Sequence, residues 1–166
     1  YAMTPVEKDD DGLATSETKI VSEKKNADTG LPLATATAPV GTKMENGAKA
    51  LELTIENAKN PSNFTVEITQ IAPKTLDISM KGLAADNNQL IKVEFYIEKG
   101  LSVVEIDHNG RKMSRCSAMK WLDADQEFYY DTNTGLLTML TKTFSPFTYT
   151  ADKFYWDNHT ASTYAT

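Results

Sequence analysis

The sequence predicts an all-β protein, an antiparallel two-sheet β-sandwich of about seven to nine strands. Apolar and polar side chains alternate with a period of two in four short segments, residues 51–55, 64–68, 76–80 and 91–97. This period, with one apolar face, is typical of antiparallel strands that cover a core with one side. Residues 117–125 are the best helical candidate, and a loop would explain them equally well.

Turn-forming residues separate the alternating segments. Asn, Asp, Gly and Pro gather in residues 45–47, 57–61, 85–88 and 109–110, where they supply Asx turns and positive φ angles. Asn109-Gly110 lies between two strand-like segments, which predicts a hairpin with a type I′ turn. Replacing Gly110 with valine is expected to destabilise this hairpin, because branched residues resist positive φ.

The closing part of the domain is predicted to be a second hairpin. The expected elements are a strand, a turn, a return strand and an aromatic closing motif, at residues 128–130, 131–135, 136–143 and 144–147. Large rings usually contribute by burial. We therefore expect Phe144, Phe147 and one of Tyr129 and Tyr130 to fill the core, and Phe144→Ala to cost about 3–5 kcal/mol.

Length and composition indicate one domain with tails. In a chain of 166 residues, residues 1–12 are predicted to be a polar tail or linker and residues 13–150 the β-sandwich domain. Residues 151–166 are predicted to be a linker toward a following module, whose aromatic part docks back on the domain. Tyr1 is not a natural start, so we expect the sequence to be a piece of a longer chain.

Charge and hydropathy exclude two classes of partner. The formal charge of −6 and the pI near 4.9, without a basic stripe, argue against nucleic acid as a partner. No apolar run approaches the roughly 20 residues that cross a bilayer, so we expect no membrane insertion by this segment.

The acidic residues resemble metal sites only superficially. Asp9, Asp10 and Asp11 lack the DxDxDG spacing of a calcium loop, and a solvated tail explains them better. A second cluster comprises Asp123, Asp125, Glu127 and Asp131. We expect a loop and an exposed strand edge there, with weak cation binding at Asp123, Asp125 and Asp131 as the alternative. No cofactor and no metal are predicted.

The sequence offers no catalytic set, so we predict that the protein is not an enzyme. The two histidines, His108 and His159, are far apart in sequence, and a histidine beside a turn is usually exposed. Arg115 and Lys112 would lower the thiol pKa of Cys116, but no histidine is positioned to activate it. There is no glycine-rich phosphate loop, no GxSxG and no HExxH motif.

Aromatic side chains are the remaining candidates for ligand binding. Trp121, Tyr129 and Trp156 would form a sugar-stacking platform if they were exposed together, as in carbohydrate-binding modules. Core or rim packing is the commoner fate of such rings.

Three stretches carry a resemblance to a known group of proteins. Residues 36–55 begin ATAPVGTKM, residues 76–87 read LDISMKGLAADN, and residues 128–147 read FYYDTNTGLLTMLTKTFSPF. Together they resemble a β-sandwich module of large secreted surface proteins of gut Gram-positive bacteria, over about residues 13–150. The closing strand more weakly resembles that of the ZU-five domain of scaffold proteins and netrin receptors.

The resemblance implies a non-enzymatic module, since neither group carries catalytic residues that could be transferred to this chain. Its expected role is structural, as a spacer, or associated with adhesion. The expected location is extracellular, in the cell wall or at the cell surface. The expected partners are neighbouring domains of the same long chain and, further, a glycan or a host surface ligand.

Overall fold

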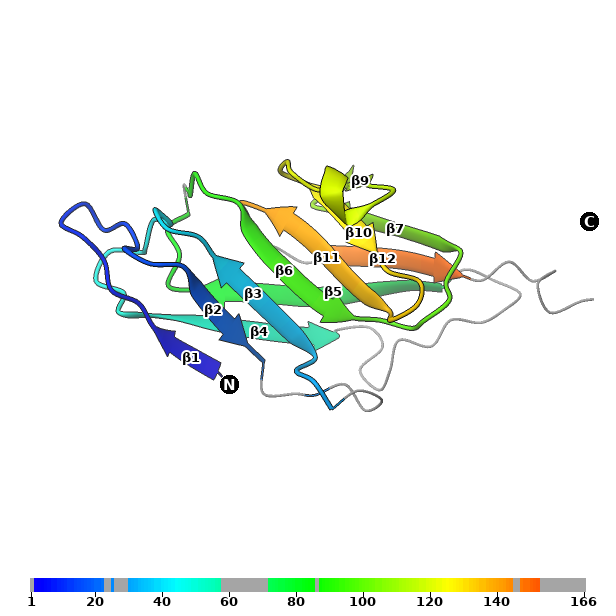
Figure 1. Cartoon of the computed structure of the whole chain (residues 1–166), viewed down its shortest axis with the longest axis horizontal. Helices are drawn as coiled ribbons and strands as arrows, with labels where there is room; N and C mark the ends of the chain where they lie inside the picture. The colour runs from blue at the N-terminus through cyan, green and yellow to red at the C-terminus, as the bar shows by residue number, and fades with distance from the viewer. Residues whose placement is uncertain are drawn as a thin grey trace, which may run out of the picture.

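The computed structural model describes residues 2–22, 25, 30–57, 72–85, 87–144 and 147–152. Within this part, twelve strands form two six-stranded sheets that pack face to face (Figure 1). The first sheet has the order β1 (Ala2–Pro5), β4 (Ala50–Asn57), β5 (Ala72–Lys81), β12 (Phe147–Asp152), β7 (Val103–His108) and β8 (Arg111–Lys112). The second has the order β2 (Thr18–Val21), β3 (Ala34–Ala38), β6 (Ile91–Tyr96), β11 (Leu136–Thr141), β10 (Glu127–Tyr130) and β9 (Ser114–Arg115).

The predicted all-β class and two-sheet arrangement are confirmed. The strand number exceeds the expected seven to nine, because the edges carry short strands such as β8 and β9, which have two residues each. Strand pairs are antiparallel except for β9 with β10. Such short segments are too brief to show a period of two, so the alternation pattern could not reveal them.

The alternating segments bury the side predicted to be apolar. On β4, Leu51, Leu53 and Ile55 face the core, and on β6 the inward side is Ile91, Val93 and Phe95. Ile78 and Met80 of β5 are buried in the same way. Residues 64–68, which were also predicted to be a strand, lie outside the described residues.

Residues 2–12 are part of the fold, so the prediction of a tail or linker over residues 1–12 is wrong for them. Strand β1 pairs with β4 in the register Ala2↔Leu53 to Pro5↔Ala50. Val6 is buried and its N–H donates to the carbonyl of Lys49. Strand β1 has only four residues, which is too short for alternation to indicate it, and the acidic run that follows suggested a solvated tail.

The hairpin predicted at Asn109-Gly110 is confirmed as the turn between β7 and β8. Asn109 and Gly110 have φ angles of 54° and 81°, which are the two positive values that a type I′ turn requires.

The second predicted hairpin joins β10 and β11. The N–H of Asp131 donates to the carbonyl of Leu136, and the Asp131 carboxylate accepts from the N–H of Asn133 at 2.9 Å. This is the Asx turn that the sequence predicts. Phe128 and Tyr130 face the core from β10, while Tyr129 is half-buried on the opposite side.

Strand β12 takes the chain back to the first sheet, where it lies between β5 and β7 (Figure 1). Phe147 and Tyr149 point inward from it and are almost fully buried. Phe144 is only partly buried against the same core. The expectation that it fills the core is therefore wrong, because the residue lies at the crossover between the sheets. We accordingly expect the cost of Phe144→Ala to fall below about 3 kcal/mol.

Two buried tyrosines predict that the fold loses stability in alkali. Burial is the largest cause that raises the pKa of Tyr130 and of Tyr149, and the nearby Glu98 carboxylate adds to it. Unfolded tyrosines ionise near pH 10. Since the folded-state pKa values are higher, their stabilising contribution is complete below about pH 10 and is lost as the pH rises further.

Denaturant melts between pH 8 and 12 measure this loss. Tyr149 alone accounts for a slope of up to about 1.4 kcal/mol per pH unit above pH 10, and Tyr149→Phe is expected to make the decline shallower. An equally steep decline in that variant would contradict the assignment.

Candidate binding surface

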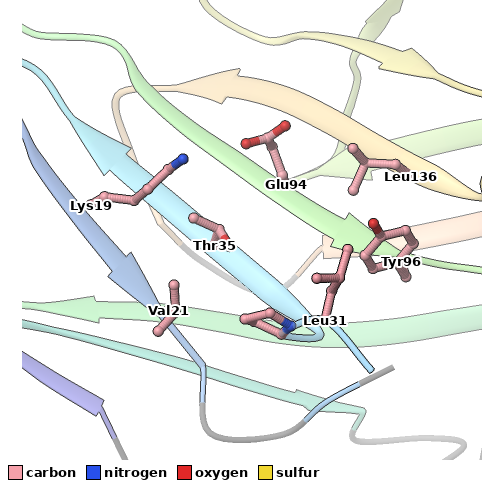
Figure 2. A pocket seen from close by; sticks show the side chains of 8 residues that line it. Lys19, Val21, Leu31, Thr35, Glu94, Tyr96 and Leu136 are labelled. Carbon is pink, nitrogen blue, oxygen red and sulfur yellow. The ribbon is translucent and has the colours of Figure 1, made fainter. Parts of the chain in front are cut away.

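A groove of about 310 Å³ lies on the outer face of the second sheet, the face directed away from the core (Figure 2). Its walls come from β2, β3, β6 and β11 and from the segment before β3: Lys19, Val21, Leu31, Pro32, Thr35, Glu94, Tyr96 and Leu136. We call this set the outer groove.

Strand alternation brings these side chains to the outer face. On β2, Thr18 and Ile20 are buried while Lys19 and Val21 are exposed. The register continues across the sheet, with Val21 opposite Thr35 on β3 and Thr35 opposite Glu94 on β6. Because successive side chains of a strand point to opposite faces, these residues form one continuous outer surface.

Several apolar side chains of the outer groove are open to solvent. Val21 and Leu31 are exposed by 42% and 53%, and Tyr96 and Leu136 are half-buried beside them. Two of the six large hydrophobic side chains that are exposed in the described residues therefore line one depression. Apolar side chains gathered in one depression can serve as a contact surface.

Two oppositely charged side chains, Lys19 and Glu94, line the outer groove. Figure 2 shows the Lys19 ammonium group and the Glu94 carboxylate at one end, and Leu31 and Tyr96 at the other. Within the described part of the chain, neither Lys19 nor Glu94 takes part in an ion pair or a side-chain hydrogen bond. Both charges are available to a ligand.

Of the three aromatic residues considered as an alternative sugar-stacking platform, the structure describes Trp121 and Tyr129. Trp121 is exposed by 58% on the short 3₁₀ helix η1 (Met119–Trp121), with the Lys120 ammonium group 5.1 Å from its ring centroid. Among the described residues, Trp121 and Tyr129 make no ring contact with each other. Trp156 lies outside the described residues. The predicted helical or loop segment at residues 117–125 contains η1 and is otherwise irregular.

Tyr129 covers the sheet surface. It lies on the outer face of β10, directly opposite Thr138 of β11. Thr138 is fully buried although it too points outward, so larger neighbours must cover it, and Tyr129 is its cross-strand partner. Packing of this kind is the commoner fate of such rings.

Two carboxylates of the acidic cluster at residues 123–131, those of Asp125 and Glu127, accept hydrogen bonds from backbone N–H groups. One oxygen of Glu127 accepts from the N–H groups of Asp123 and Ala124, at 3.1 and 2.8 Å. Asp125 accepts from the N–H of Lys142 at 3.0 Å. Across the residues that the structure describes, no three His, Cys, Asp or Glu side chains are grouped so that they could hold a metal ion.

His108 is buried, so the expectation that it is exposed is wrong. It follows Val104 and Ile106 on the inner face of β7 and is exposed by 4%. Its ring stacks on Phe147 with a centroid distance of 3.9 Å and an interplanar angle of 19°. The period of two in β7 places His108 on the inner face, with Val104 and Ile106. The Asn109-Gly110 turn beside it had suggested an exposed strand end.

Hydrogen bonds to Gln126 fix the tautomer of His108. The Gln126 amide nitrogen donates to the hydroxyl of Thr141 and to the carboxylate of Asp125, at 2.9 and 3.0 Å. Because a carboxylate only accepts, the amide oxygen of Gln126 must face His108 Nδ1, 2.7 Å away. Nδ1 therefore carries the proton, and His108 joins the two sheets structurally.

Cys116 is not activated. Burial raises the pKa of its thiol, and the carboxylates of Glu127 and Asp123 raise it further. Of the two cations expected to lower it, Lys112 instead pairs with a glutamate of β7 and Arg115 donates to a backbone carbonyl. The lowered thiol pKa expected from Arg115 and Lys112 is therefore wrong, because the charges that act on the thiol in the folded protein are negative.

The acidic run near the N-terminus is a turn. The Asp9 carboxylate accepts from the N–H groups of Asp11 and Leu13, at 2.9 and 3.0 Å. Asp9 thus holds the loop that leads to the bridge between Leu13 and Lys43. This capping role is the ordinary one for aspartate in a turn.

Comparison with known proteins identifies no relative. No family model, no curated protein and no solved structure matches the chain. In the described residues, no helix is long and apolar enough to cross a membrane.

Proposed function

We propose that this chain is a non-enzymatic module of a bacterial cell-surface protein, with a structural, spacer or adhesion-associated role. The observation that carries the proposal is the outer groove: an open depression on the sheet surface with exposed apolar residues and two charges that are unpaired within the described residues. A surface of this kind suits contact with another molecule. The sequence resemblance to surface-protein modules supports the same role.

Several polar side chains that resemble candidate acids or bases act within the fold. Glu127, Asp125 and Asp9 accept backbone N–H groups, and His108 holds Gln126 across the core. A catalytic acid or base must reach a substrate proton. These side chains instead satisfy the chain's own donors and acceptors.

Protease treatment of intact cells tests the proposed location. Trypsin acting on intact cells of the source organism is expected to release the peptide of residues 121–142, which is bounded by Lys120 and Lys142. A cytosolic enzyme that is released only after lysis serves as the control. Detection of the peptide solely in lysed cells would contradict a surface location.

A second function, carbohydrate binding, rests on the exposed ring of Trp121. Open aromatic faces can stack on sugars, and Trp121 is exposed by 58%. A glycan array probed with the whole chain and with a Trp121→Ala, Trp156→Ala double variant separates the two functions. Binding that the double variant loses would favour a sugar-recognition module. The absence of binding across a broad array would leave the first proposal in place.

A further inference from the structure

We infer that strand β2, at the edge of the second sheet (Figure 1), binds an extended segment of another polypeptide as an added antiparallel strand. The bound segment carries an apolar residue opposite Val21 and an acidic residue opposite Lys19. The inference deepens the proposed binding role and rests on it. Its test can fail without affecting the cell-surface location, since peptide binding and protease release are measured separately.

The main-chain groups of Lys19 and Val21 point away from β3, toward the open edge. The N–H of Ser22 donates to the carbonyl of Ala34, which the strand register places directly opposite. Hydrogen-bonded and non-hydrogen-bonded pairs alternate along antiparallel strands. Ile20 is therefore hydrogen-bonded to β3, whereas the N–H and C=O groups of Lys19 and Val21 face outward. Among the described residues, no other segment forms a hydrogen bond with these four groups.

The three other sheet edges are less suited to strand addition. Strand β1 carries Pro5, which has no N–H group to donate. Strands β8 and β9 have two residues each. Short edges and prolines are common means by which proteins prevent unwanted strand pairing. Strand β2 has four residues and no proline, so among the described edges it offers a partner strand the most main-chain groups.

The side chains of Lys19 and Val21 set the side chains of the bound strand. Both are exposed on the outer face of the sheet, and directly opposite side chains of an antiparallel pair are about 4.5–5.5 Å apart. Lys19 has no ion pair within the described part of the chain, so an acidic residue opposite it forms an opposite-charge pair. An apolar residue opposite Val21 covers a side chain that is exposed by 42%.

The order of these two residues follows from the strand direction. In an antiparallel partner, the residue opposite Val21 comes first and the residue opposite Lys19 follows two positions later. The residue between them points to the other side of the sheet. The bound segment therefore reads apolar–x–acidic, and its main chain forms four hydrogen bonds with β2, as in other cases of strand addition to a sheet edge.

A second copy of the chain fits β2 less well than an acidic strand of another protein. Pairing two β2 strands about a twofold axis through the same groups would put Lys19 opposite Val21 of the other copy. The two Lys19 side chains would then be diagonal neighbours on one face, about 7–8 Å apart. Each chain also carries a formal charge of −6. Like charges therefore oppose self-pairing, while Lys19 favours an acidic partner.

NMR titration of the full chain with the acetylated and amidated hexapeptide TITETT tests the inference. The peptide isoleucine and glutamate take the positions opposite Val21 and Lys19. Saturable amide shifts are expected at both residues. Their N–H groups should also exchange with solvent about tenfold more slowly at saturating peptide, because new hydrogen bonds protect them. The N–H of Ile20, which already donates to β3, should keep its exchange rate.

N-methylation of the peptide separates main-chain pairing from side-chain contact. A methyl group on the glutamate nitrogen removes the donor to the Lys19 carbonyl. It is expected to weaken binding about tenfold, which corresponds to about 1.4 kcal/mol. A methyl group on the nitrogen of the threonine between isoleucine and glutamate is the matched control. That N–H points away from β2, so the affinity should be retained.

Charge reversal supplies a readout that general damage to the fold would not give. Wild-type protein is expected to prefer TITETT over TITKTT by about threefold, as for an exposed ion pair. Lys19→Glu should reverse this preference. Lys92→Glu is a matched reversal on the same face, in the same row of the sheet but two strands away on β6, and should leave the preference unchanged.

Three results would overturn the inference. The first is the absence of saturable shifts at Lys19 and Val21, and the second is equal weakening by the two N-methylated peptides. The third is a Lys19→Glu variant that keeps the wild-type preference while its spectrum shows the native fold. Protection of the Lys19 amide that rises with protein concentration in the absence of peptide would replace the other polypeptide with a second copy as the occupant.

Discussion

Phe147→Ala is expected to destabilise the protein by about 3–5 kcal/mol, because it removes a whole ring from the core and leaves a cavity. Phe147 is exposed by 1% and stacks on His108. It begins β12, which pairs with both β5 and β7 in the middle of its sheet. The loss therefore affects both the packing between the sheets and the register of a central strand. Urea-induced unfolding, followed by tryptophan fluorescence, measures it.

Phe144→Ala is the matched control for Phe147→Ala. The two residues are three positions apart and lose the same atoms, but Phe144 is only partly buried against the core. We expect a cost of about 1–2 kcal/mol, since the hydrophobic contribution follows the area removed from water. Equal costs for the two variants would contradict the assignment of Phe147 as the core residue of the closing motif.

Gly135→Ala is expected to cost about 3 kcal/mol or more. Gly135 has a φ of +80°, which L-residues with a side chain adopt at a cost of about 1–2 kcal/mol. An added Cβ would also lie 2.4 Å from the carbonyl oxygen of Ile97. Because that atom belongs to the backbone, the turn between β10 and β11 must shift away from β6, with a further penalty of about 1–3 kcal/mol. Thermal unfolding of the purified variant measures the total.

Gly110→Ala separates the two contributions. Gly110 has a nearly identical φ of +81°, but an added Cβ there would meet nothing within 4 Å. The variant should lose only about 1–2 kcal/mol, the cost of the backbone conformation. Gly110→Val should lose more than Gly110→Ala, since the branched side chain resists this φ further. If Gly135→Ala and Gly110→Ala behaved alike, the close approach of Gly135 to β6 would be disproved.

The long strands and the two hairpins could be predicted because local patterns determine them. The alternation in β4 and β6 repeats over enough residues to be recognised, and Asn109-Gly110 requires a particular turn. Strand β1 could not be predicted in this way. It has only four residues, too few to show a period of two, and it pairs with β4, a contact distant in sequence that local patterns do not contain.

The candidate site was only partly predictable. Alternation placed Glu94 and Tyr96 on the outer side of their strand. It could not show that Val21 and Leu31 lie beside them, since β2, β3 and β6 are brought together by sheet order. For His108 and Cys116, the neighbouring residues in the sequence led to a wrong expectation of the side chain's environment. A turn next to His108 suggested exposure, and nearby cations suggested a lowered thiol pKa for Cys116, yet the surroundings of both side chains depend on the tertiary fold.

Hydroxyl-radical footprinting of the chain on intact cells, compared with the purified chain, tests the central claim that the outer groove is the working surface. The expected result is reduced oxidation of Leu31, Tyr96 and Leu136 on cells, while the exposed Met119 of η1 reacts equally in both states. Unchanged oxidation of the groove residues, or protection confined to Trp121 and Met119, would contradict the claim.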